Sequence, residues 1–309
     1  MYYNKNITIE TLKKQKVEPA IKYDVAVLKK LFADSSPLVR GYAFNILQSY
    51  RAYTNEIVDI AKEAFKNEKD VFVLHRGIHA LSNLKHHTKP DDSEIAQLIL
   101  REAKSDNALI RNQVAIYLGR IWFKDSKEAV DTELMLIDDK VPLVAHSACS
   151  NSGHLNNERI LAKVAEIMKD DSKEDLQENC AIGLIRSWWN ENTNETAYKM
   201  TMDYFKKTPR KRDTPYWFTI STMNLSESTV ANNLKAAPYF NKGEFISAMK
   251  EIIKDENSSL LTRKTAITSI AIYGTKAELV ALGPVIKKLK DRDSKYMEEA
   301  YTEELKKKN

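Results

Sequence analysis

The sequence contains little of what sheets, disulfide frameworks and membrane spans require. Its 309 residues include only eight glycines and eight prolines, too few for the frequent turns between strands. Two cysteines cannot build a disulfide framework. No apolar run approaches the length of a membrane-spanning helix, and the N-terminal residues do not resemble a signal peptide. These shortages favour helices joined by short polar loops.

The charge balance excludes no partner and favours none. The chain has 48 basic and 43 acidic residues, a net charge of +5, which is a smaller excess than dedicated nucleic-acid binders usually carry. A hydrophobic share of 43% is enough to bury a continuous core, so we expect most of the chain to be ordered. We expect a cytoplasmic protein; a mature exported chain whose leader was removed is the alternative.

A unit of about 34 residues repeats along the chain. Each unit begins with polar or acidic residues, followed by an anchor residue that is apolar in most units, then a small residue and a further apolar residue at intervals of four. The anchors are separated by 37, 34, 34 and 32 residues, and the last two by 34. An arginine follows the anchor in several units, as in Val39-Arg40 and Ile110-Arg111. The anchors are Val39, Arg76, Ile110, Val144, Leu176, Thr262 and Tyr296, with Trp217 as an irregular anchor in the long gap.

This spacing marks one face of a helix, and a second amphipathic helix follows in each unit, for example over 57–65. Neither helix buries its apolar face alone, so neighbouring units must stack. The proline near the helix start, the acidic residue and the apolar-Arg pairs resemble HEAT repeats over residues 34–300. The resemblance implies an all-α fold, a right-handed α-α superhelix of about seven helical hairpins.

We expect one solenoid domain over residues 1–309. Within it, residues 1–33 form an N-terminal cap, 34–190 regular repeats, 191–243 an irregular region and 244–309 the C-terminal repeats. The irregular region combines polar and basic runs with three prolines. Pro284 falls inside the last strong helical pattern, and we expect it to kink or split that helix.

The search for reactive side chains predicts no catalytic residue, no metal and no cofactor. His75 and His79 share a helical face, but Arg76 follows the first histidine, so packing explains them better than a metal. His146, Cys149 and His154 are close in sequence, as a thiol nucleophile and its base would be. Cys149 nevertheless adjoins a packing position, and Cys180 occupies the equivalent position in the next unit. Both cysteines are therefore predicted to be buried in the core.

The strongest local anomaly is a basic run that is followed by aromatic residues. Basic residues beside large aromatic rings are able to bind phosphates and stack on bases, or to bind an acidic protein surface. The other interpretation is a solvated loop whose aromatic neighbours fill a wide core. The candidate binding residues are Lys206, Lys207, Arg210, Lys211, Arg212, Trp217, Trp188 and Trp189.

One enzyme family with HEAT-like repeats, the alkylpurine DNA glycosylases, has a Ser-Trp-Trp-Asp segment that Ser187–Asn190 resembles. Asn190 stands where that family has the acidic residue. The segment Ser105–Asn107 resembles a later element of the family, but here it precedes the tryptophans. The resemblance implies a glycosylase-like enzyme only as an alternative.

The sequence therefore predicts a non-catalytic scaffold or adaptor, a monomer that binds a protein partner through a concave surface lined by the second helices. The alternative is a nucleic-acid-binding HEAT-like protein, related to the glycosylases. Nothing in the sequence indicates membrane binding.

Overall fold

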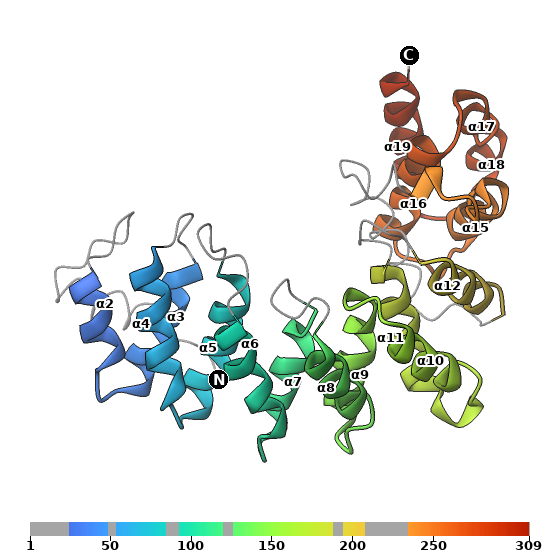
Figure 1. Ribbon diagram of the computed structural model, residues 1–309. Helices are drawn as coiled ribbons and strands as arrows, with labels where there is room; N and C mark the ends of the chain where they lie inside the picture. Colours follow the sequence, from blue (N-terminus) through green and yellow to red (C-terminus); the bar gives the residue numbers. More distant parts are fainter. Residues whose placement is uncertain are drawn as a thin grey trace. The chain divides into compact units, whose positions relative to one another are not determined.

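The computed structural model describes residues 25–48, 54–84, 93–119, 126–187, 194–207 and 234–308. Within these ranges the chain forms sixteen α-helices and no β-strand (Figure 1). The expected all-α, HEAT-like helical-repeat fold is confirmed. None of the described helices is both long and apolar enough to cross a membrane.

The chain divides into two compact units, Met1–Ala148 and Cys149–Asn309. The division falls inside helix α9 (Pro142–Asn151), and each unit is described by itself. The predicted four segments of a single solenoid, and the cytoplasmic location, stay predictions.

Unit 1 is a double layer of helices, in which α3, α5 and α7 pack side by side and α2, α4, α6 and α8 form the second row. Aromatic rings fill the space between the rows, and Phe44 meets Phe65 edge to face at 6.2 Å between ring centroids. The helices are α2 (Val25–Phe32), α3 (Pro37–Gln48), α4 (Asn55–Lys66), α5 (Val71–Asn83), α6 (Ser93–Arg101), α7 (Ala108–Tyr117) and α8 (Lys127–Ile137).

Polar side chains fix where the helices begin. Asp70 caps α5 by accepting from the amides of Phe72 and Val73, so this helix starts at Val71. Its third residue, the anchor position in the other units, is therefore Val73 rather than Arg76. Val73 is fully buried. The repeat frame of this unit lies three residues earlier than the sequence pattern indicated.

The arginines of the apolar-Arg pairs hold successive loops together. Arg111 donates from Nε and Nη2 to the two carboxylate oxygens of Asp139 at 2.7 and 3.0 Å, and from Nη1 to the carbonyl of Ser105 at 2.8 Å. Its guanidinium therefore joins the loop before its own helix, α7, to the loop before α9, the first helix of the next hairpin. Asp139 in turn accepts from the amide of Val141. The hydrogen bond from Arg111 lowers the pKa of Asp139.

The same contact recurs twice, and each time the acidic partner lies 28 residues after the arginine. Arg40 donates to both carboxylate oxygens of Glu68 at 2.7 and 3.1 Å. Arg263 donates to Asp291 at 2.8 Å, with its own side chain fully buried. We call the three pairs Arg40–Glu68, Arg111–Asp139 and Arg263–Asp291 the arginine clasps. They explain why arginine follows the anchor residue.

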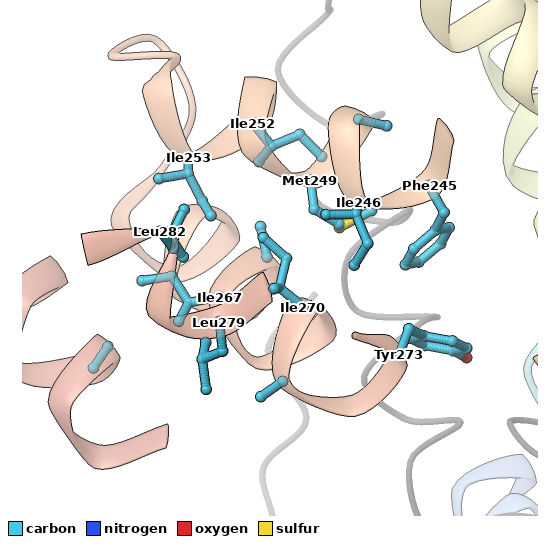
Figure 2. Packing of buried hydrophobic residues seen from close by; sticks show 14 of the residues in the cluster. Phe245, Ile246, Met249, Ile252, Ile253, Ile267, Ile270, Tyr273, Leu279 and Leu282 are labelled. Carbon is cyan, nitrogen blue, oxygen red and sulfur yellow. The ribbon is translucent and has the colours of Figure 1, made fainter. Parts of the chain in front are cut away.

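Unit 2 has one continuous core across its C-terminal helices. Figure 2 shows Ile246, Met249 and Ile253 of α15 on one side of this core and Ile267 and Ile270 of α16 on the other. The helices after α9 are α10 (Glu158–Ile167), α11 (Glu174–Arg186), α12 (Glu195–Lys207), α15 (Lys242–Lys254), α16 (Leu260–Tyr273), α17 (Lys276–Val280), α18 (Gly283–Lys288) and α19 (Ser294–Lys307).

Pro284 splits the helical pattern in which it lies, as expected. Helix α17 ends at Val280, and Pro284 lies in the first turn of α18, where its missing amide proton leaves no hydrogen bond unmade.

Candidate functional site

Most of the predicted basic and aromatic binding residues lie outside the described residues. These are Trp188, Trp189, Arg210, Lys211, Arg212 and Trp217. Lys206 and the main chain of Lys207 end helix α12. The Lys206 ammonium forms an ion pair with Glu244 near the start of α15, and this hydrogen bond raises the pKa of Lys206. Lys206 therefore links two helices of unit 2, while about half of its side chain stays exposed.

Beside this ion pair, aromatic side chains gather in the core of unit 2. Phe240 packs against Phe245 and Tyr273 at ring-centroid distances of 5.6 and 5.8 Å, and Tyr198 lies 6.0 Å from Phe240. Burial raises the pKa of Tyr198 to about 12, and it raises that of Tyr273 as well. Both phenols therefore stay protonated near neutral pH. These described aromatics fill the core of unit 2. The aromatic residues for which a core-filling role was the other interpretation lie outside the described residues.

The histidines considered as metal ligands have packing roles. The His79 ring stacks on Tyr117 with 4.9 Å between centroids. His75 is half-buried, and its burial, together with the charge of Arg76, lowers its pKa. No group of three or more His, Cys, Asp or Glu side chains in the described ranges has a geometry suited to a metal ion. His86 and His87 lie outside those ranges.

The cysteines are core residues, as predicted. Cys149 and Cys180 are both fully buried. The segments that resemble the glycosylases are structural where they are described. The buried Ser187 hydroxyl donates to the carbonyl of Leu184 at 2.6 Å, and Asn107 caps α7.

The one fully buried carboxylate without a partner in the described part of the chain is Glu133, on α8. Its side chain is 1% exposed, and neither of its oxygens has a hydrogen-bond partner. Ala129, Val130, Leu136 and Ile137, all buried, lie one turn away on the same face of the helix. An unpartnered buried carboxylate is strongly unfavourable in its charged form. Burial accordingly raises the pKa of Glu133 well above its usual range.

A second unsatisfied polar group lies on α7, in the same helical hairpin. The side-chain oxygen of Asn112 is buried and accepts no hydrogen bond. Neither group contributes a hydrogen bond to the fold, yet both reduce stability. Departures of this kind from good packing, and carboxyls with a raised pKa, are found more often at functional sites than elsewhere in proteins. Glu133 is therefore the candidate functional residue.

The sequence carries a signal for the burial of Glu133. Apolar residues at 129, 130, 136 and 137 define the buried stripe of α8, and Glu133 stands in the middle of that stripe. A charged residue at the centre of an apolar stripe is unusual in a helix that packs against a core.

Replacing Glu133 by methionine is expected to stabilise the protein by about 1–3 kcal/mol near neutral pH, because it removes an unsatisfied buried group at similar volume. In the folded chain the pKa of Glu133 is raised above the 4.5 of an ordinary glutamate. The folded form therefore retains a proton that the unfolded form loses as the pH rises through that value. The stability gain should widen upward from about pH 4.5 until the raised pKa is reached. Urea unfolding of both proteins at several pH values measures the difference in their free energies of unfolding. A difference that stays constant or becomes smaller as the pH rises would contradict the raised pKa of Glu133.

No protein-family model matches the chain. A curated relative, deoxyhypusine hydroxylase of Candida glabrata, is 23% identical over 229 residues, which are 72% of this chain and 63% of the relative. The chain thus covers less than two thirds of that relative's length.

A solved structure shares the fold. The complex of CpcE and CpcF of phycocyanin lyase from Nostoc matches with a TM-score of 0.51 and 11% identity, over 93% of this chain and 97% of that one. Human deoxyhypusine hydroxylase in complex with glycerol matches with a TM-score of 0.37 and 13% identity, over 81% and 96% of the two chains.

The relative in sequence is an enzyme, and this contradicts the predictions of a non-catalytic scaffold and of no enzymatic activity. The physical reason for the error is the architecture. Helical repeats place side chains from successive hairpins next to one another, so reactive groups need not be close in sequence. The absence of a short catalytic motif was therefore weak evidence against catalysis.

Proposed function

We propose that this chain is an enzyme that acts on a protein substrate, with Glu133 as the acid–base group of its reaction. The observation that carries the proposal is the complete burial of a carboxyl group that makes no hydrogen bond. The relationship in sequence to a hydroxylase supports catalysis. The lyase whose chains share the fold is named for phycocyanin, a protein, which supports a protein as the substrate class.

Burial among apolar side chains raises the pKa of the Glu133 carboxyl well above its usual range and so favours its protonated form. A protonated carboxyl is able to donate a proton or a hydrogen bond to a substrate oxygen or nitrogen and to take the proton back later. Since the side chain is covered, substrate binding must shift the α7–α8 hairpin to reach it. A hairpin with two unsatisfied polar groups is less strongly held than a fully satisfied one, which favours such a movement.

For substrate binding we propose the basic and aromatic residues in the irregular region and directly before it, with the five basic residues facing an acidic protein surface. They are Lys206, Lys207, Arg210, Lys211, Arg212, Trp188, Trp189 and Trp217. We also assign the chain to the HEAT-repeat superfamily as part of this proposal, on the apolar-Arg pairs and the arginine clasps.

The test compares host cells with and without the chain by intact-protein mass spectrometry, then repeats the comparison after complementation. We expect at least one protein whose mass depends on the wild-type chain. The Glu133→Gln variant should lower that modification by about 10²-fold or more, because an amide cannot transfer the proton. The control is Glu128→Gln, on the exposed face of the same helix, which should retain full modification.

Two results would count against the proposal in different ways. If no protein changes mass when the chain is absent, the chain does not modify proteins. If the mass change persists with Glu133→Gln, the chain is an enzyme but Glu133 is not its acid–base group. Circular dichroism of each variant distinguishes loss of the proton from loss of the fold.

A further inference from the structure

We infer that Cys149 and Cys180 form a redox-sensitive pair that closes into an intramolecular disulfide and so locks helix α9 to helix α11. The thiol of Cys180 donates to Cys149 Sγ at 2.9 Å, and both residues are fully buried within unit 2. A disulfide bond is about 2.05 Å long, so the sulfurs need to approach by only about 0.9 Å. The inference is independent of the proposed function.

The backbones around the two thiols are in direct contact, which fixes their separation. A Cβ atom on Gly183 would lie 2.0 Å from the carbonyl oxygen of Cys149, and one on Gly153 would lie 1.9 Å from the carbonyl oxygen of Gly183. Neither position accommodates a side chain. The two glycines therefore allow the two backbone segments to lie closer together than any other residue would permit. This close approach brings the sulfurs together.

Polar contacts on both sides of the thiols hold the register of the two segments. Ser150 Oγ donates to the side-chain oxygen of Asn179 at 2.8 Å, and Arg186 donates to the side-chain oxygen of Asn151. The Ser152 hydroxyl donates to the carbonyl of Cys149 at 2.8 Å. The sulfurs are consequently adjacent because of the packing of α9 and α11, and not because of a flexible loop.

A low-molecular-weight disulfide such as oxidised glutathione is a sufficient oxidant. One cysteine thiolate attacks a glutathione sulfur, forming a mixed disulfide and releasing one reduced glutathione. The second thiolate then attacks the cysteine sulfur of the mixed disulfide, the Cys149–Cys180 bond forms, and the second glutathione leaves. The two thiol protons pass to the two glutathione thiolates. Because both thiols are buried, the first step requires a local opening of unit 2.

To test the inference, the full-length protein is equilibrated in buffers of reduced and oxidised glutathione, with and without urea. After quenching and alkylation in denaturant, intact mass shows the fraction that carries the internal disulfide. We expect the effective concentration of the two thiols in the native protein to exceed that in urea by about 10²-fold or more, because folding holds them together. The oxidised protein should also melt several degrees above the reduced one, since the bond restricts the unfolded chain.

Cys149→Ser and Cys180→Ser serve as single-thiol controls and should melt at the same temperature with and without oxidant. An effective concentration equal to that in urea would overturn the inference. So would a stable mixed disulfide with glutathione, a disulfide-linked dimer, or an oxidised protein that melts below the reduced one.

Discussion

Replacing Gly183 by alanine is expected to destabilise unit 2 by more than about 3 kcal/mol, because the added methyl group would meet backbone rather than a movable side chain. Its Cβ would lie 2.0 Å from the carbonyl oxygen of Cys149 and 2.5 Å from the hydroxyl of Ser152. Relief requires the segment from Cys149 to Gly153 to move away from α11, which breaks the close contacts between them. Overpacking of a well-filled interior usually costs about 1–3 kcal/mol, and a clash between two backbones belongs at or above that range.

Gly243→Ala is the matched control, since its Cβ would meet only the side-chain oxygen of Asn241, at an ordinary 3.5 Å. Because alanine forms helices more readily than glycine, this variant should be unchanged or more stable by about 0.5–1 kcal/mol. Thermal and urea unfolding followed by circular dichroism measure both variants. Equal stability of Gly183→Ala and the wild type would show that the close approach of α9 and α11 is not maintained in solution.

Replacing Arg263 by alanine is expected to cost about 3–5 kcal/mol, the usual result of removing one partner from a buried ion pair. The side chain of Arg263 is fully buried, and its Nε and Nη2 donate to the carbonyl of Ile253 and to Asp291, both at 2.8 Å. The substitution leaves both acceptors without this donor. Arg40→Ala removes the equivalent clasp where the arginine is 20% exposed, so water replaces part of the interaction and about 1–2 kcal/mol is expected.

Acid sensitivity gives this prediction a second measurement. The hydrogen bond from Arg263 lowers the pKa of Asp291 below the 3.8 of an ordinary aspartate. The stability from this pair is therefore complete above about pH 3.8 and is lost as the pH falls through the lower folded pKa. The Arg263→Ala variant should lack this component, so its stability should fall less steeply in acid than that of the wild type. Parallel pH profiles for the two proteins would contradict the assignment.

The repeat architecture was predictable because its signals are local. Most first helices carry an anchor residue with a small residue four positions later, and several begin directly after a polar cap. The prediction of Arg76 as the anchor of its unit is wrong, because the frame depends on where the helix begins, and the cap Asp70 places the start of α5 at Val71. Pro284 was predicted correctly, since a proline limits the backbone whatever its surroundings.

The candidate site was harder to predict, for two physical reasons. The significance of Glu133 depends on burial and on the absence of a partner, and both are properties of the packed hairpin rather than of a motif. The juxtaposition of Cys149 and Cys180 depends on backbone contacts between Gly153 and Gly183, 30 residues apart. The sequence identified both cysteines as core residues, but their separation of 2.9 Å follows only from how two helices pack.

The arginine clasps also affect how the chain folds during its synthesis. Each joins residues only 28 positions apart, so it closes a short loop at a small entropic cost. Proteins dominated by such short-range contacts fold rapidly, and repeat arrays are able to start folding at any hairpin. Arg40 meets Glu68 without any residue beyond α5, and Arg111 meets Asp139 before any residue of unit 2 is needed. Unit 1 can therefore fold stepwise during its synthesis, while the ribosome is still translating unit 2.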